Sequence, residues 1–147
     1  MCGKEQLHKD LTAYVWNTVQ GLGIREIARR TDVQPSTITR CVRRVEDLQE
    51  WQEWETLLDQ LALVTCPDGV NDEAVCTAMG VEHDEVVAAW NTAVPFVKQN
   101  GAVVAITDAP IAGVFLDGEV VHKIDRRVAM AWIGMAALEP RTNGKVR

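Results

Sequence analysis

Apolar residues recur at helical spacing through the first hundred residues of the chain and at strand spacing after residue 101. The clearest stretch covers residues 21–45, GLGIREIARRTDVQPSTITRCVRRV, where the spacing requires two short helices with a break at residues 31–34. Its apolar positions are Ile27, Ala28, Val33, Ile38, Val42 and Val45. Pro35 suits the first position of the second helix, because its φ is already helical and its missing N–H is not needed there. This pattern predicts a helix-turn-helix, with Ala28 where the helices approach closely and Asp32 in the left-handed conformation of the turn.

Charge changes the interpretation of this stretch. Six arginines fill the positions left over once the apolar ones are buried, against only two acids, in a chain of net charge −6. A basic helix pair in an acidic protein predicts a local phosphate-binding surface. We expect the second helix to enter the major groove of double-stranded DNA, and the predicted DNA-binding residues are Arg25, Gln34, Ser36, Thr37, Arg40, Arg43 and Arg44. Of these, Gln34, Ser36, Thr37 and Arg40 should reach base edges or nearby phosphates, whereas Arg43 and Arg44 should bind the DNA backbone. The alternative is a plain helical hairpin with a solvated arginine face.

The segments around this pair are also predicted to be helical. Residues 7–20 predict an opening helix across the back of the pair. The second helix has no evident stop, since apolar residues continue at helical spacing to residue 61, so we expect one long helix with an acidic face. From residue 46 to residue 97 the chain has 12 acids and no lysine or arginine. This face is either a solubilising surface, or Trp51 and Trp54 anchor a contact to another chain or to the second half.

The turn at Cys66-Pro67-Asp68-Gly69 is the predicted boundary between two modules, residues 1–66 and 67–139, with residues 140–147 a flexible tail or linker. A shift of 48 residues places the apolar skeleton of the first motif on residues 72–94, with Asp32 on Gly80. The polar positions are inverted in charge, because Gln34, Ser36 and Thr37 become Glu82, Asp84 and Glu85. We therefore expect a second, degenerate helix-turn-helix that does not read DNA, although any two amphipathic helices with a glycine turn can align this well.

The second module also predicts strands. Short β-rich runs occur at residues 102–107, 111–117 and 119–124, and Asp117-Gly118 between the last two is a hairpin signal. Residues 126–138 predict a very apolar closing helix. That helix is either clamped in the core or offers a partner a docking surface. The predicted fold class is mainly α with a small antiparallel β element: a helix-turn-helix followed by a winged-helix-like second module.

Composition limits the function classes. The chain has 147 residues, and 47% hydrophobic content supports a packed core. It has no apolar run of membrane-spanning length and no export leader, so we expect a cytoplasmic protein with reduced cysteines. We find no paired carboxylates, activated nucleophile, phosphate loop or metal-ligand spacing, and therefore expect no enzyme, no cofactor and no metal.

The stretch GLGIREIARRTDVQPSTITRCVRRVEDL resembles the helix-turn-helix of alphaproteobacterial transcription regulators that include the activators of gene transfer agents. Residues 101–138 look like the strand-plus-helix module that follows it there. The resemblance implies promoter binding and contact with RNA polymerase through a separate C-terminal domain, so that this chain would be the DNA-binding part of a longer activator.

The sequence thus predicts a sequence-specific DNA-binding transcription regulator, an activator at promoters, associated with the nucleoid. Its predicted partners are double-stranded DNA, RNA polymerase or another regulator, and a second copy in a homodimer. The alternative function is a protein-binding module, such as an anti-activator or a polymerase-contacting adaptor, on a helix-turn-helix scaffold.

Overall fold

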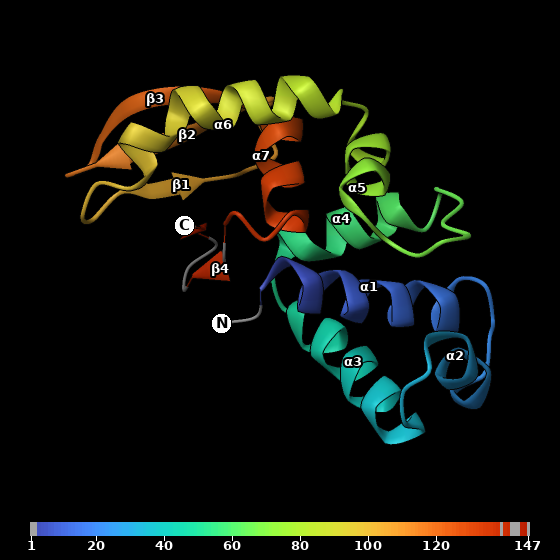
Figure 1. Cartoon of the computed structure of the whole chain (residues 1–147). Helices are drawn as coiled ribbons and strands as arrows, with labels where there is room; N and C mark the ends of the chain where they lie inside the picture. Colours follow the sequence, from blue (N-terminus) through green and yellow to red (C-terminus); the bar gives the residue numbers. More distant parts are fainter. Residues whose placement is uncertain (1–2, 139, 142–144, 147) are drawn as a thin grey trace.

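The computed structural model describes residues 3–138, 140–141 and 145–146, and within them the chain is mainly helical with a small antiparallel sheet (Figure 1). Its elements are α1 (Lys4–Thr18), α2 (Ile24–Thr31), α3 (Pro35–Leu48), α4 (Gln52–Leu61), α5 (Asp72–Met79), α6 (His83–Val97), β1 (Val103–Ala105), β2 (Ile111–Leu116), β3 (Glu119–Asp125), α7 (Arg126–Gly134), β4 (Pro140–Arg141) and β5 (Lys145–Val146). The coarse fold class predicted from the sequence is therefore confirmed.

The sheet has the strand order β3-β2-β1-β5-β4, and its pairings are antiparallel. Asp117 and Gly118 join β2 to β3 with φ of 54° and 81°, which is the pair of left-handed residues that a tight two-residue hairpin needs. The predicted hairpin is confirmed. Within the tail predicted to be flexible, residues 145–146 form the short strand β5, which pairs with β1, and residues 140–141 form β4, which pairs with β5 at the edge of the sheet; the rest of 140–147 lies outside the described residues.

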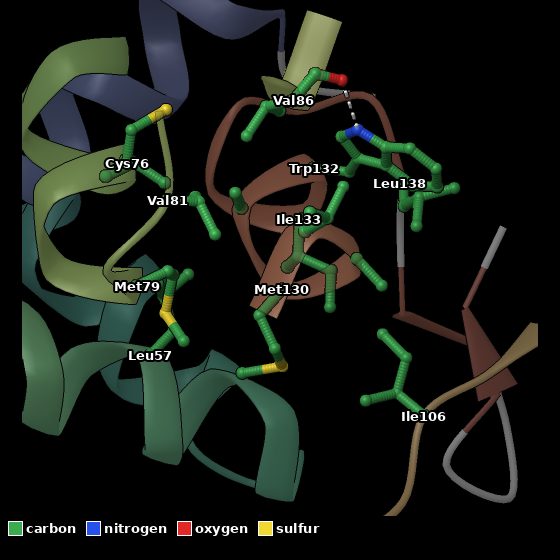
Figure 2. Close-up of a cluster of buried hydrophobic side chains, with 14 of the residues drawn as sticks. Leu57, Cys76, Met79, Val81, Val86, Ile106, Met130, Trp132, Ile133 and Leu138 are labelled. Atoms are coloured by element: carbon green, nitrogen blue, oxygen red, sulfur yellow. Dashed lines mark hydrogen bonds between the residues drawn. The ribbon is translucent and has the colours of Figure 1, made fainter. Parts of the chain in front are cut away.

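The helix α7 is buried at the centre of the molecule (Figure 2). Of the two alternatives for this apolar helix, burial in the core is therefore observed, and not an exposed docking surface. Every residue from Val128 to Gly134 is buried, and Trp132 donates its indole N–H to the Val86 carbonyl at 3.2 Å. Gly134 lies so close to Val75 that a Cβ there would be 2.7 Å from its side chain. The helix ends at this glycine, four residues before the predicted end.

One hydrophobic core crosses the predicted boundary at residue 66. It joins Leu11 and Val45 from the first module to Leu57 and Leu61 on α4 and to residues of α5, α6, α7 and the sheet. A second, smaller cluster lies among α1, α2 and α3, and consists of Ala13, Trp16, Ile27, Ala28, Ile38, Cys41 and Val42. The turn at residues 66–69 therefore separates the modules in sequence but not in packing.

The predicted long acidic helix is wrong, because α3 ends at Leu48 and α4 begins at Gln52. The Trp51 N–H bonds to the Leu48 carbonyl at 3.0 Å across the break. The break reflects tertiary packing, because it allows the side chains of Trp54 and Leu57 to enter the main core. Trp54 is only 2% exposed there. Helical spacing alone continued across the break and gave no sign of it.

The helices α5 and α6 repeat the backbone of α2 and α3 with a shift of 48 residues. The helix α2 spans residues 24–31 and α5 spans 72–79, while α3 begins at residue 35 and α6 at residue 83. The residue after the first helix is left-handed in both, with φ of 56° at Asp32 and 70° at Gly80. The Val33 and Val81 N–H groups make equivalent bonds to the carbonyls of Ala28 and Cys76. We call residues 24–48 and 72–97 the first and second units.

Candidate nucleic-acid interface

The first unit holds α3 on a small apolar base. Ile27 and Ala28 on α2 pack with Ile38 and Val42 on α3 and with Trp16 on α1. The indole N–H of Trp16 donates to the Cys66 carbonyl at 2.9 Å, which joins this base to the turn before the second module. The side chain of Val33 was predicted to be part of this core, but it is 39% exposed.

An ion pair braces α3 against α1. Arg44 donates from Nε and Nη2 to the two carboxylate oxygens of Asp10, both at 2.9 Å, and the Asp10 side chain is only 4% exposed. Gln6 donates a further hydrogen bond to Asp10 at 2.8 Å. A buried carboxylate needs such partners, because desolvation otherwise penalises its charge. Arg44 was predicted to bind phosphate, whereas its guanidinium is engaged in holding the two helices together.

Two further arginines pair within α2. Arg29 and Arg30 both bind the carboxylate of Glu26, Arg30 at 3.3 Å, and these bonds lower the pKa of Glu26, with the Arg30 bond the largest cause. Arg30 also lies over the ring of Trp16 at 5.9 Å. Neither arginine was in the predicted DNA-binding set, and their charge is partly neutralised locally.

The remaining arginines are Arg25, Arg40 and Arg43, and all three are exposed. None of them has a carboxylate partner within the part of the chain that the structure describes. Ser36, Arg40 and Arg43 are spaced by four and three residues, so they form one stripe of α3 opposite the buried stripe of Ile38, Val42 and Val45. The stripe ends at an acidic residue, because Asp47 follows Arg43 by four residues on the same face of the helix.

The polar residues at the start of α3 are also available. Gln34 occupies the N-cap position but makes no side-chain cap, so its amide is not used by the helix. Gln34 and Ser36 are exposed, while Thr37 is half-buried and its hydroxyl lies 3.4 Å from Nη2 of Arg40. The structure thus brings Gln34, Ser36 and Arg40 onto one end of a braced helix, with Arg25 at the start of the neighbouring one.

The second unit presents acids at the equivalent positions. Arg25 corresponds to Glu73, and the start of α6 carries Glu82, Asp84 and Glu85 in place of Gln34, Ser36 and Thr37. The positions of Arg40, Arg43 and Arg44 carry Ala88, Asn91 and Thr92. A cavity of about 840 Å³ lies at this turn and is lined by residues 71–73, 76, 77 and 80–83. Such a surface repels phosphate, in agreement with the inverted chemistry seen in the sequence.

A polar contact that the sequence did not suggest joins α1 to the second unit. His8 Nε2 lies 3.4 Å from Asp72, whose other oxygen accepts from Lys4 at 2.8 Å. Burial lowers the pKa of His8, whereas the charge of Asp72 and the backbone of Gly134 on α7 act to raise it. The only sequence signal was position, since His8 lies next to the buried stripe of Leu7 and Leu11.

The described residues contain no group of three or more histidine, cysteine or acidic side chains placed to hold a metal ion. Cys41, Cys66 and Cys76 are buried free thiols whose pKa is raised by burial, and Cys2 lies outside the described residues. Among the described helices, none has both the length and the apolar composition needed to cross a membrane.

Comparison of the chain with protein-family models, curated proteins and solved structures gave no match.

Proposed function

We propose that the chain is a sequence-specific DNA-binding regulator of transcription that binds double-stranded DNA through the first unit as a helix-turn-helix. The observation that carries the proposal is the exposed stripe of Ser36, Arg40 and Arg43, which have no carboxylate partner in the described residues, on a helix whose opposite face is buried. An α-helix fits the major groove, and arginine and glutamine side chains recognise base edges there.

The roles within the interface follow from position. Gln34, Ser36 and Arg40 lie toward the N-terminal end of α3, which is the end that contacts bases when a recognition helix docks. Arg25 and Arg43 flank this group and would bind phosphates. Thr37 supports Arg40 through its hydroxyl. We leave Arg44 out of the contact set, because its guanidinium braces α3 against the buried Asp10.

This interface predicts modest affinity for a single copy. Three arginines supply most of its positive charge, and the acids at residues 46, 47 and 50 follow directly along the chain. Affinity should fall steeply with salt, since each neutralised phosphate releases a counterion. Specific recognition then requires two copies, as in a homodimer on a two-part site, or a further domain. An activator role, RNA polymerase as a partner and a nucleoid location remain part of the proposal and rest on the family resemblance.

The test measures DNA affinity in single alanine variants of the full chain. Sites are first selected from a randomised duplex pool, and binding is then followed by fluorescence anisotropy on selected and unselected duplexes. Arg40→Ala should cost about 1–3 kcal/mol on the selected site and relax the base preference, because it removes a base-edge contact. Arg43→Ala should weaken binding to both duplexes alike, because a phosphate contact carries no sequence information.

Lys98→Ala is the matched control, because it removes one exposed positive charge at the far end of α6 and should change affinity little. Equal affinity in wild type, Arg40→Ala and Arg43→Ala would contradict the proposed interface. A loss in Lys98→Ala as large as in Arg43→Ala would show a general charge effect rather than a site.

A second candidate function is a protein-binding module, such as an anti-activator or a polymerase-contacting adaptor. The observation that favours it is the acidic second unit, in which Glu73, Glu82 and Asp84 are exposed. The two candidates predict different behaviour, since a protein-binding module would not be retained on DNA at low salt.

A further inference from the structure

We propose that the acidic face of the second unit binds the basic face of the first unit in a second copy of this chain. The basic face is defined by Arg25, Arg40 and Arg43, and the acidic face by Glu73, Glu82 and Asp84. The contact would cover the same arginines that are proposed to bind DNA, so self-association and DNA binding would exclude each other.

The acidic and basic faces carry opposite charges, and the two units that carry them share the same backbone arrangement. Both units have an eight-residue helix, a left-handed turn residue and a second helix that begins three residues later. Arg25 and Glu73 occupy the same position on this shared backbone, and Ser36 and Asp84 do as well. At this first position one unit carries a positive charge and the other a negative charge, and at the second position a neutral serine is replaced by an acid.

Both sets of charges lack ion-pair partners in the described part of one copy. No described ion pair includes Glu73, Glu82 or Asp84, just as none includes the three arginines of the basic face. Opposite charges within about 10 Å attract at moderate salt, and complementary patches of this kind set the orientation of protein contacts.

The shape of the acidic face also suits an arginine side chain. It is not flat, because the cavity of about 840 Å³ at the turn between α5 and α6 is lined by Glu73, Glu82 and His83. A long guanidinium side chain suits such a cavity, since it can place its charge between two carboxylates and its methylene groups along Val81.

The contact has to be made between copies. The helices α3 and α6 lie at opposite ends of the molecule, with α1, α4 and α7 between them (Figure 1). The single core fixes both units to each other, so the two faces of one chain cannot meet. When two copies bind in this way, one copy keeps a free basic face and the other keeps a free acidic face. Further copies can therefore add head-to-tail as the concentration rises.

The experiment compares three charge-changed versions of the full chain by sedimentation velocity over a range of concentrations at about 50 mM and about 300 mM salt. The acid-to-lysine variant carries Glu73→Lys, Glu82→Lys and Asp84→Lys. The arginine-to-glutamate variant carries Arg25→Glu, Arg40→Glu and Arg43→Glu. The control changes three exposed acids outside the acidic face: Glu50→Lys, Glu55→Lys and Asp59→Lys.

Wild type should gain mass with concentration at low salt, and the association constant should fall about tenfold or more at high salt. Each of the first two variants should remain monomeric alone, because each carries two faces of like charge. Mixed together they should associate, since the lysine face of one then meets the glutamate face of the other. The control should self-associate as wild type does.

The proposal is overturned if wild type stays monomeric at low salt, or if the mixture does not associate although both variants retain the wild-type circular dichroism spectrum. If the lysine variant does not fold, the neutral set Glu73→Gln, Glu82→Gln and Asp84→Asn replaces it, and the proposal then requires that this set weaken self-association. If a monomeric wild type binds an arginine-rich peptide, the face belongs to another basic protein and the second-copy proposal is wrong. DNA is absent from these measurements, so their failure leaves the proposed DNA interface standing.

Discussion

At the residue scale, Asp32 and Gly80 show how the same turn is built from different side chains. Both residues are left-handed, and each directly follows an eight-residue helix. The Asp32 side chain is exposed and makes no hydrogen bond among the described residues, and a Cβ at Gly80 would meet nothing within 4 Å. The turn therefore constrains only the backbone conformation at this position.

Asp32→Gly should change the free energy of unfolding by no more than about 0.5 kcal/mol or stabilise slightly, because glycine adopts this conformation without strain. Asp32→Val should lose about 1–2 kcal/mol, because a β-branched residue is strained there. Urea unfolding followed by circular dichroism measures both, with Gly80→Asp and Gly80→Val as the matched pair in the second unit. A clear loss in Asp32→Gly would show that the carboxylate has another role, such as capping α3.

The role of Arg44, in contrast, depends on its partner, the buried Asp10 on α1. Arg44→Ala should lower the free energy of unfolding by about 2–3 kcal/mol, because it leaves the buried Asp10 carboxylate without its charged partner. Arg43→Ala removes an exposed side chain next to it and should stay within about 0.5 kcal/mol.

A double-mutant cycle with Asp10→Ala separates this pair from other effects. The combined loss should be smaller than the sum of the two single losses, since either change breaks the same contact. Equal stability of Arg44→Ala and Arg43→Ala would contradict the bracing role and would return Arg44 to the predicted phosphate contacts.

At the element scale, α1 has contacts on two sides. It packs along α3 through the Asp10–Arg44 pair, and it meets the second unit and α7 through His8. The groups that face His8 are Asp72 and Lys4, with His83 lying 3.8 Å from Asp72. This arrangement makes the docking of α1 sensitive to the protonation of one imidazole.

Burial lowers the pKa of His8 below its ordinary value of about 6.5, so the folded chain resists a proton that the unfolded chain accepts. Stability from this group is fully present above about pH 6.5 and is lost as the pH falls from there through the lower pKa of the folded state. We expect urea midpoints to fall between about pH 7 and pH 5.5 in wild type and to fall less in His8→Gln. His83→Gln is the control, because that side chain is half exposed. An unchanged slope in His8→Gln would show that other groups cause the pH dependence.

At the scale of the whole molecule, two modules in sequence share one core. Leu57 lies before the turn at residues 66–69 but packs with residues that follow it, including Val75 and Ile133. The first unit is tied to this core by the Trp16 bond to Cys66 and by Leu11 and Val45. Unfolding of either module therefore exposes the apolar surface of the other.

The full chain should unfold in one cooperative transition, with coincident curves for circular dichroism and tryptophan fluorescence. Leu57→Ala should lower the free energy of unfolding by about 2–5 kcal/mol through the cavity that it leaves. Its effect should reach Trp16 on α1 in the first module as well as Trp132 in the core, and Trp16→Phe and Trp132→Phe versions separate the two fluorescence signals. Two transitions, with Trp16 unaffected by Leu57→Ala, would show independent modules.

The local features of this protein are encoded in short stretches of its sequence. Apolar spacing together with Pro35, Asp32 and Gly80 predicted both helix pairs, because helix starts and left-handed turns depend on a few neighbouring residues. The Asp117-Gly118 hairpin was predictable for the same reason. The exposed arginine stripe also followed from periodicity, since side chains opposite a buried stripe must face outward.

Which side chains are engaged by partners distant in sequence depends on the packing of the folded chain. The break between α3 and α4 depends on where Trp54 and Leu57 find a core, which helical spacing cannot reveal. Arg43 and Arg44 are adjacent and chemically identical, yet one is exposed and the other braces α3, because only Arg44 lies beside Asp10 from another helix. Val33 and Val81 occupy the same position in the two units, yet Val33 is exposed and Val81 is buried. The difference comes from the surroundings that the fold gives each turn.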